Sequence, residues 1–303
     1  MFGLLQHQSI SMSDMLQHNL LHVRDLWFEE LAIFLGSCVF FLALSWLLEA
    51  KAGLRFRIRA VTPKAPQMRR EAFNSIRAFV IYNVAQIAMR AAFFTIGLVL
   101  VLDRPAIPLW LVVLSFPMVI VVHDAYFYWL HWSMHSPALF RLTHWEHHRS
   151  RVPTVFAAHS FSIAESVGHG FFPIFYVLVF PCTWPTLIFF YIVMIFHDVA
   201  IHSGIEMFPT ALVTGKRFGW LCGAVHHDMH HAIGTTNYGL YFRFWDKLMK
   251  TEHPAFERIY AYIRSPENDG QAYKKLLGGA RLGGDGRAGA VALESTPEPV
   301  IAS

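Results

Sequence analysis

The chain has 303 residues and a formal net charge of +4; 54% of its residues are hydrophobic and only 15% are charged. This composition is too apolar and too poor in charge for an ordinary soluble domain, and the three cysteines lack the CxxC spacing of thiolate metal sites. We therefore expect an integral membrane protein without structural disulfides and with no nucleic-acid partner.

Three apolar segments are long enough to span a membrane. A polar segment, residues 1–26, precedes the first and lacks the order of a signal peptide. The spans are expected at 27–48, 76–102 and 106–122, and the third continues through aromatic residues to the first histidines of a cluster.

A fourth apolar stretch, residues 171–199, is interrupted by prolines at 173, 181 and 185. Proline breaks helices, so a helical hairpin that enters and leaves on one side is favoured over a straight span. The predicted fold class is thus all-α, with about three transmembrane helices plus this hairpin. The membrane domain is expected over 27–264, and the Gly-, Ala-, Pro- and Glu-rich tail, 265–303, is expected to be flexible.

The orientation follows from basic residues. The segment 51–70 carries seven lysines and arginines and no acidic residue, and it joins the first two spans. The positive-inside rule places it in the cytosol. A turn at Asp103-Arg104-Pro105 then reverses the chain, and the third span returns to the cytosolic side where the histidines begin. A multi-pass protein with a cytosolic histidine-rich cap is predicted.

Fourteen of the 18 histidines lie between His123 and His231. Eight of them form three boxes, one HxxxH and two HxxHH: His131 and His135; His144, His147 and His148; His227, His230 and His231. Residues three or four apart share a helix face, so each box can direct two or three imidazoles to one point.

Neutral imidazole binds iron, zinc and copper. Eight such side chains exceed what one tetrahedral ion requires, which indicates two metal ions. His197 and His202, at the end of the hairpin, lie on the same predicted side and would complete a set of ten. A cytosolic metal site of a membrane transporter or storage protein is a second interpretation, although ionisable residues are few within the spans.

The boxes and their flanks resemble the fatty acid hydroxylase and sterol desaturase superfamily of membrane di-iron enzymes. The resemblance covers roughly residues 75–252. It includes Tyr128-Trp129-Leu130-His131, the segment 153–161 (PTVFAAHSF), Asn237-Tyr238-Gly239 and Trp245-Asp246. Two positions depart from the family pattern: Trp132 follows His131 where arginine is usual, and Ser162-Ile163 stands where sterol desaturases tend to have His-Pro. The class of lipid is left open.

The resemblance implies an oxidoreductase that uses two Fe ions and O₂ to hydroxylate or desaturate a lipid C–H bond. It implies no catalytic residue separate from the metal ligands. A separate electron donor is expected, either a ferredoxin or a b-type cytochrome with its reductase. A non-catalytic, lipid-associated family member is a further alternative.

Histidine ligands usually donate their second ring N–H to a carboxylate or carbonyl. Five residues are candidates for such a supporting role or a related one near the metals: Asp124, His159, Asp198, Asp228 and Asn237.

Overall fold

The computed structural model describes residues 12–52, 56–95, 107–180 and 182–277. Within these ranges the regular structure is helical, and β-pairing is limited to two isolated bridges, Arg57 with Ile205 and Leu221 with Phe242. The predicted all-α class is confirmed. The long helices are α1 (Met12–Ala52), α2 (Ala65–Thr95), α3 (Leu109–Met134), α6 (Ile163–Val179) and α7 (Trp184–Ile201). The short ones are α4 (Phe140–Thr143), α5 (Trp145–His148), η2 (Val155–Ala157), α8 (Thr210–Val213), α9 (Ala224–Ile233), α10 (Phe244–Met249), α11 (Phe256–Ile263) and α12 (Ala272–Leu276).

In the described part of the chain, three helices are long and apolar enough to cross a membrane: residues Phe28–Lys51 of α1, all of α3 and all of α7. The first and third predicted spans are therefore present. The predicted second span, 76–102, is described only to Thr95, and the described helix α2 is not among the three. Its buried residues include the polar Asn74, Asn83 and Gln86, which lower the mean hydropathy of the helix. The predicted turn at 103–105 lies outside the described residues.

The predicted hairpin is formed by α6 and α7, but it begins at Ile163 instead of residue 171. Pro173 lies inside α6 and does not end it. Both helices have a hydroxyl cap, since Ser162 Oγ accepts from Glu165 N and Thr183 Oγ1 accepts from Thr186 N. These caps satisfy backbone donors that would otherwise be unpaired at the helix starts.

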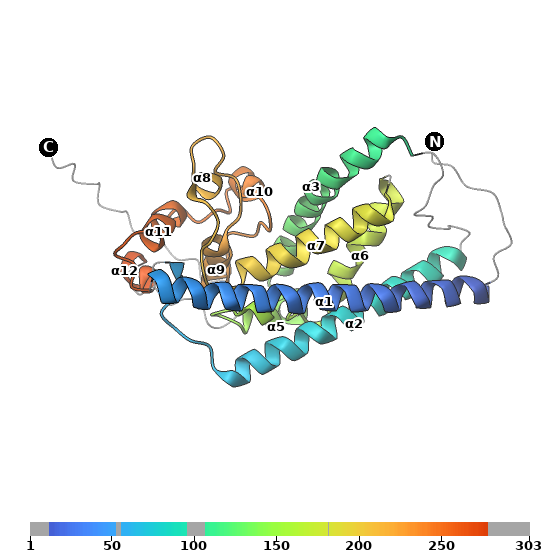
Figure 1. Cartoon of the computed structure of the whole chain (residues 1–303), viewed down its shortest axis with the longest axis horizontal. Coiled ribbons are helices and arrows are strands. Elements are labelled where there is room, and N and C mark those ends of the chain that lie inside the picture. The colour runs from blue at the N-terminus through green and yellow to red at the C-terminus, as the bar shows by residue number, and fades with distance from the viewer. Residues whose placement is uncertain (1–11, 53–55, 96–106, 181, 278–303) are drawn as a thin grey trace.

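The long helices pack as a bundle, and the short helices α8 to α12 gather at one end of it (Figure 1). Helix α2 packs against α6, α1 against α7 and α2, and α3 against α7 and α6. Gly170 permits a close approach of α6 to α2, because a Cβ there would stand 3.2 Å from the Tyr82 Cα. The shared core is aromatic and includes Phe79, Phe172 and Phe190, whose van der Waals contacts favour helix packing in lipid, where no hydrophobic driving force acts between helices.

Both terminal segments are partly helical where they are described, which differs from the prediction only for the tail, because no structure was predicted for the polar segment. The polar segment is helical from Met12 and continues without a break into the first span as α1. The tail is folded as far as Leu277, because buried Tyr273 on α12 donates to Asp228 Oδ1 of α9 at 2.6 Å. The rest of the predicted tail lies outside the described residues.

Candidate metal centre

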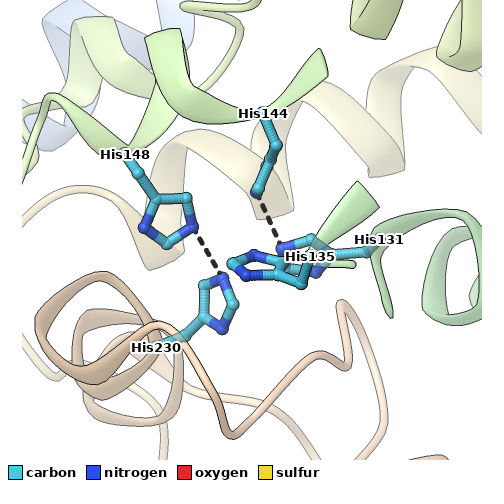
Figure 2. A group of neighbouring side chains, drawn as sticks. All are labelled: His131, His135, His144, His148 and His230. Carbon is cyan, nitrogen blue, oxygen red and sulfur yellow. Dashed lines mark hydrogen bonds between the residues drawn. The ribbon is translucent and has the colours of Figure 1, made fainter. Parts of the chain in front are cut away.

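Nine histidines form two adjoining groups where the bundle of long helices meets the short helices at its end. The ligand nitrogens of each group lie within 4.8 Å of one another. Group A, shown in Figure 2, holds five histidines and group B holds four. Group A is His131, His135, His144, His148 and His230, and group B is His147, His202, His227 and His231.

The two HxxHH boxes each supply both groups. His144 and His148 are four residues apart and enter group A, whereas His147 between them enters group B. In α9 the pair at a spacing of four, His227 and His231, enters group B and His230 enters group A. A spacing of four keeps two side chains on one helix face, so helical geometry explains this division.

Backbone carbonyls set the protonation of three ring nitrogens. His131 Nδ1 donates to the Tyr238 carbonyl at 2.8 Å, His230 Nδ1 to that of Thr236 at 2.7 Å, and His202 Nδ1 to that of Asp198 at 2.7 Å. A carbonyl can only accept, so in a neutral ring Nδ1 carries the hydrogen and Nε2 presents a lone pair.

These lone pairs meet other imidazoles. In group A, His131 Nε2 is 3.0 Å from His144 Nε2, and His230 Nε2 is 2.9 Å from His148 Nε2. In group B, His202 Nε2 lies 3.0 Å from His227 Nε2, 3.3 Å from His231 Nε2 and 3.4 Å from His147 Nε2. A single lone pair cannot form hydrogen bonds with all three of these nitrogens. Among the described residues, His135 Nε2 has no hydrogen-bond partner. Converging nitrogen lone pairs fit a metal cation in each group.

Burial keeps these rings neutral. It lowers the pKa values of His144, His147 and His148 well below their ordinary value, and neighbouring histidines lower them further. The pKa values of His227 and His231 are lowered for the same two reasons. Neutral imidazole is the form that coordinates metals, so the cluster is ready to bind at neutral pH.

His197 is the one predicted ligand that the structure leaves outside both groups. Its Nε2 donates to the Leu240 carbonyl at 2.9 Å, and its ring packs against Tyr241 and Phe208. His202 lies five residues further on, which turns it by about 140° around the helix axis at about 100° per residue. Only one of the two therefore faces the cluster, and nine of the ten expected ligands lie in the two groups.

Two of the five candidate supporting residues lie beside group B. The Asp198 carbonyl accepts from His202, and Asp198 Oδ1 is 3.3 Å from the same Nδ1. His159 Nε2 lies 3.8 Å from Asp198 Oδ2 and is thus one residue removed from His202.

The other three hold the surrounding chain and make no described hydrogen bond to a grouped histidine. Asp124 Oδ1 accepts from the backbone N–H groups of Tyr241 and Phe242. Asp228 Oδ1 accepts from Arg59 Nε at 2.7 Å and from Tyr273. Asn237, at a positive φ of 61°, donates to the carbonyl of His226 and accepts from the N–H of His253.

Two acidic residues near the cluster were not predicted. Glu165, in the first turn of α6, accepts from His144 Nδ1 at 2.5 Å. Asp246 accepts from the N–H groups of Tyr238 and Gly239 and so holds the turn whose carbonyl bonds to His131. Glu165 is 21 positions from its partner, beyond any helical spacing; its only sequence signal is that it is the single acidic residue in an apolar helix.

A cavity lies within the bundle beside the cluster. Aromatic and aliphatic residues form most of its lining. Three lining residues contact grouped histidines: Phe127 lies edge-on to His131, Phe161 packs against His147, and the Asp198 carbonyl accepts from His202. A largely apolar lining with a few polar groups is typical of small-molecule sites.

The fold and the site define a helical membrane protein with a buried polyhistidine cluster suited to metal ions. Residues 116–251 match the family model described as fatty acid hydroxylase. This match and the similar proteins below confirm the resemblance of the histidine boxes and their flanking segments to the fatty acid hydroxylase and sterol desaturase superfamily.

Three similar curated proteins are named for sterol oxidation. Human cholesterol 25-hydroxylase is 34% identical over 44% of this chain and 48% of its own length. The Delta(7)-sterol 5(6)-desaturase of Leptosphaeria maculans is 28% identical over 46% of this chain and 37% of its own length. Human lathosterol oxidase is 29% identical over 41% of this chain and 40% of its own length. The match thus spans less than half of each relative, and no solved structure matches the chain.

Proposed function

We propose that this protein is an O₂-dependent membrane oxidoreductase that hydroxylates or desaturates a lipid, with one iron ion held by each histidine group. The observation that carries the proposal is the convergence of imidazole lone pairs in two groups against one wall of an apolar cavity. The names of the relatives favour a sterol or a related lipid.

Iron with dioxygen supplies an oxidant strong enough for an unactivated C–H bond, which no side chain can supply. The residues of the chain have supporting tasks. The carbonyls of Tyr238, Thr236 and Asp198 fix the ring orientation of His131, His230 and His202. Phe127 and Phe161 line the cavity beside His131 and His147, where their apolar rings would keep water away from the hydrocarbon.

The proposal is tested by metal content together with lipid analysis. The purified chain is expected to hold close to two iron ions, and deletion of its gene is expected to remove a lipid that is heavier by one oxygen or lighter by two hydrogens. A content of four or more metal ions, or an unchanged lipid profile, contradicts the proposal. Electrons would come from a separate ferredoxin or b-type cytochrome with its reductase.

We place the metal centre on the cytosolic side. Arg59, within the basic segment that the positive-inside rule assigns to the cytosol, donates to Asp228 of α9, the helix that carries the third histidine box. The basic segment and the cluster therefore share one end of the bundle.

Cysteine labelling tests this orientation, because the three natural cysteines are buried. Cysteines at the exposed positions Lys64 and Arg149 should resist an impermeant thiol reagent in intact cells, whereas one at Arg104 should react. Labelling of the first two from outside would reverse the assignment.

A further inference from the structure

Large apolar side chains gather on the outside of the cap, which is formed by the short helices α8 to α12 at one end of the bundle (Figure 1). They come from α8, from the segment between α8 and α9, and from α10. Trp220 is 51% exposed, and Phe244 and Leu248 are each 57% exposed. Exposed apolar groups that lie close together mark a binding surface. The set, called the cap surface below, is Leu212, Phe218, Trp220, Phe244, Leu248 and Met249.

Hydrogen bonds between these segments make the side chains one surface. The Trp220 N–H donates to the Leu212 carbonyl at 3.1 Å, and the Arg243 N–H donates to the Trp220 carbonyl at 2.7 Å. Lys247 Nζ of α10 also donates to the Gly219 carbonyl at 3.2 Å. These bonds hold α8, the segment around Trp220 and the start of α10 together, so their exposed residues lie close to one another.

The cap surface continues onto a membrane-spanning helix. Phe244 contacts Trp245, whose ring packs edge-on against Trp129 of α3 with the ring centroids 5.8 Å apart. Trp129 in turn contacts Trp132, and both are exposed in the last two turns of this span. Exposed tryptophans near the end of a transmembrane helix are typical of the membrane–water interface. The cap surface therefore starts at the level where α3 leaves the bilayer.

The charges exposed around the cap surface are positive. The segment 207–251 exposes four cations: Lys216, Arg217, Lys247 and Lys250. Its two acidic residues, Asp228 and Asp246, are both buried. Aromatic and aliphatic side chains beside lysine and arginine are the pattern of surfaces that lie on anionic lipid. A second copy of the same surface would bring like charges together, which disfavours self-association.

We propose that the cap surface docks on an anionic phospholipid bilayer. Its apolar side chains enter the interfacial layer, and its four cations lie beside the lipid phosphates. Helix α10 also carries Asp246, which holds the turn at Tyr238 and Gly239 beside His131. Docking thus fixes the position of the metal centre relative to the bilayer. The inference concerns where the cap lies and does not depend on the proposed function.

Lipid quenching of a fluorophore on the full chain, reconstituted in lipid nanodiscs, tests the docking. The three natural cysteines are buried, so an NBD label is attached to Phe244→Cys or, if this variant does not fold, to Leu248→Cys. Lipids with a nitroxide near the headgroup should quench the label, and more strongly when phosphatidylserine is added to phosphatidylcholine. Ala261→Cys on α11 is the matched control, because its exposed neighbours Glu257 and Arg258 have opposite charges. Its label should stay unquenched in both lipids.

A charge reversal tests the cations. In discs with phosphatidylserine, Lys216→Glu combined with Arg217→Glu should lower the equilibrium constant for docking at least about tenfold, because each cation near an anionic surface contributes about fivefold. The quenching of the label reports this loss. The matched control, Arg258→Glu combined with Lys274→Glu, makes the same change in net charge on α11 and α12 and should keep the wild-type quenching.

The proposal is overturned if the label on α10 is not quenched, if the label on α11 is quenched equally, or if the charge reversal leaves the quenching unchanged. Equal quenching with and without phosphatidylserine also overturns it, because the cations would then have no part in docking. Self-association that buries the α10 label without lipid quenching would assign the surface to a second copy of the chain and contradict the proposal.

Discussion

Replacement of Glu165 by alanine should weaken metal binding in group A and leave group B largely intact. Glu165 is fully buried and accepts from His144 Nδ1 at 2.5 Å, which orients the ring so that Nε2 faces His131. Loss of a residue that supports a histidine ligand usually lowers metal affinity by a factor of about 10 to 100, or about 1.4–2.7 kcal/mol.

The assay is the iron retained per chain as a chelator is increased, which requires no turnover. Wild-type protein should lose its two ions together, whereas Glu165→Ala should lose one at a chelator concentration about 10 to 100 times lower. Glu165→Gln should be intermediate, because its amide oxygen can still accept from Nδ1–H. Ser166→Ala is the control: Ser166 is buried in the same turn but bonds only to the Ser162 carbonyl. Retention of both ions by Glu165→Ala, or an equal loss in the control, would refute the reasoning.

Three further predictions concern group B, pH and packing. His202→Ala should reduce the iron content toward one ion per chain while His197→Ala retains two; equal contents in both variants would contradict the placement of His197 outside the groups. Burial raises the pKa of Glu206 from 4.5 to about 7. Between these two pH values the folded state binds a proton that the unfolded state lacks. The free energy of unfolding therefore rises by on the order of 3 kcal/mol as the pH falls through this window. The thermal midpoint of the wild type relative to Glu206→Gln should therefore rise from pH 8 to pH 5, and a fall would refute the sign. Gly170→Ala should destabilise the protein by about 1–3 kcal/mol in thermal unfolding, because its Cβ would meet backbone of α2 at 3.2 Å. Gly168→Ala, whose Cβ would meet only a leucine side chain at 3.4 Å, should be neutral or stabilising, and equal destabilisation of both would count against this explanation.

Local periodicity explains what the sequence predicted well. All eight box histidines lie in the two groups, and the pairs at a spacing of four, His144 with His148 and His227 with His231, share a group because that spacing keeps two side chains on one helix face. The apolar runs predicted α1 and α3 for a similar reason, since span length depends on consecutive residues alone. The hairpin was also foreseen from its prolines, although its first helix starts eight residues earlier than expected.

Features that depend on contacts between distant segments could not be predicted in this way. The assignment of His147 to group B and of His148 to group A requires the position of α9, and Glu165 meets His144 only because α6 packs beside the second box. Nothing in the apolar pattern of α1 indicates that Glu30 faces a cavity with residues of α2 and α7. The sequence by itself determined the helices, the membrane class and the chemistry of the ligands, because these follow from composition and from neighbours within one turn. Only the tertiary structure decided which histidines share a group and where the cavity lies, because both are set by side-chain packing between helices that are far apart in the chain.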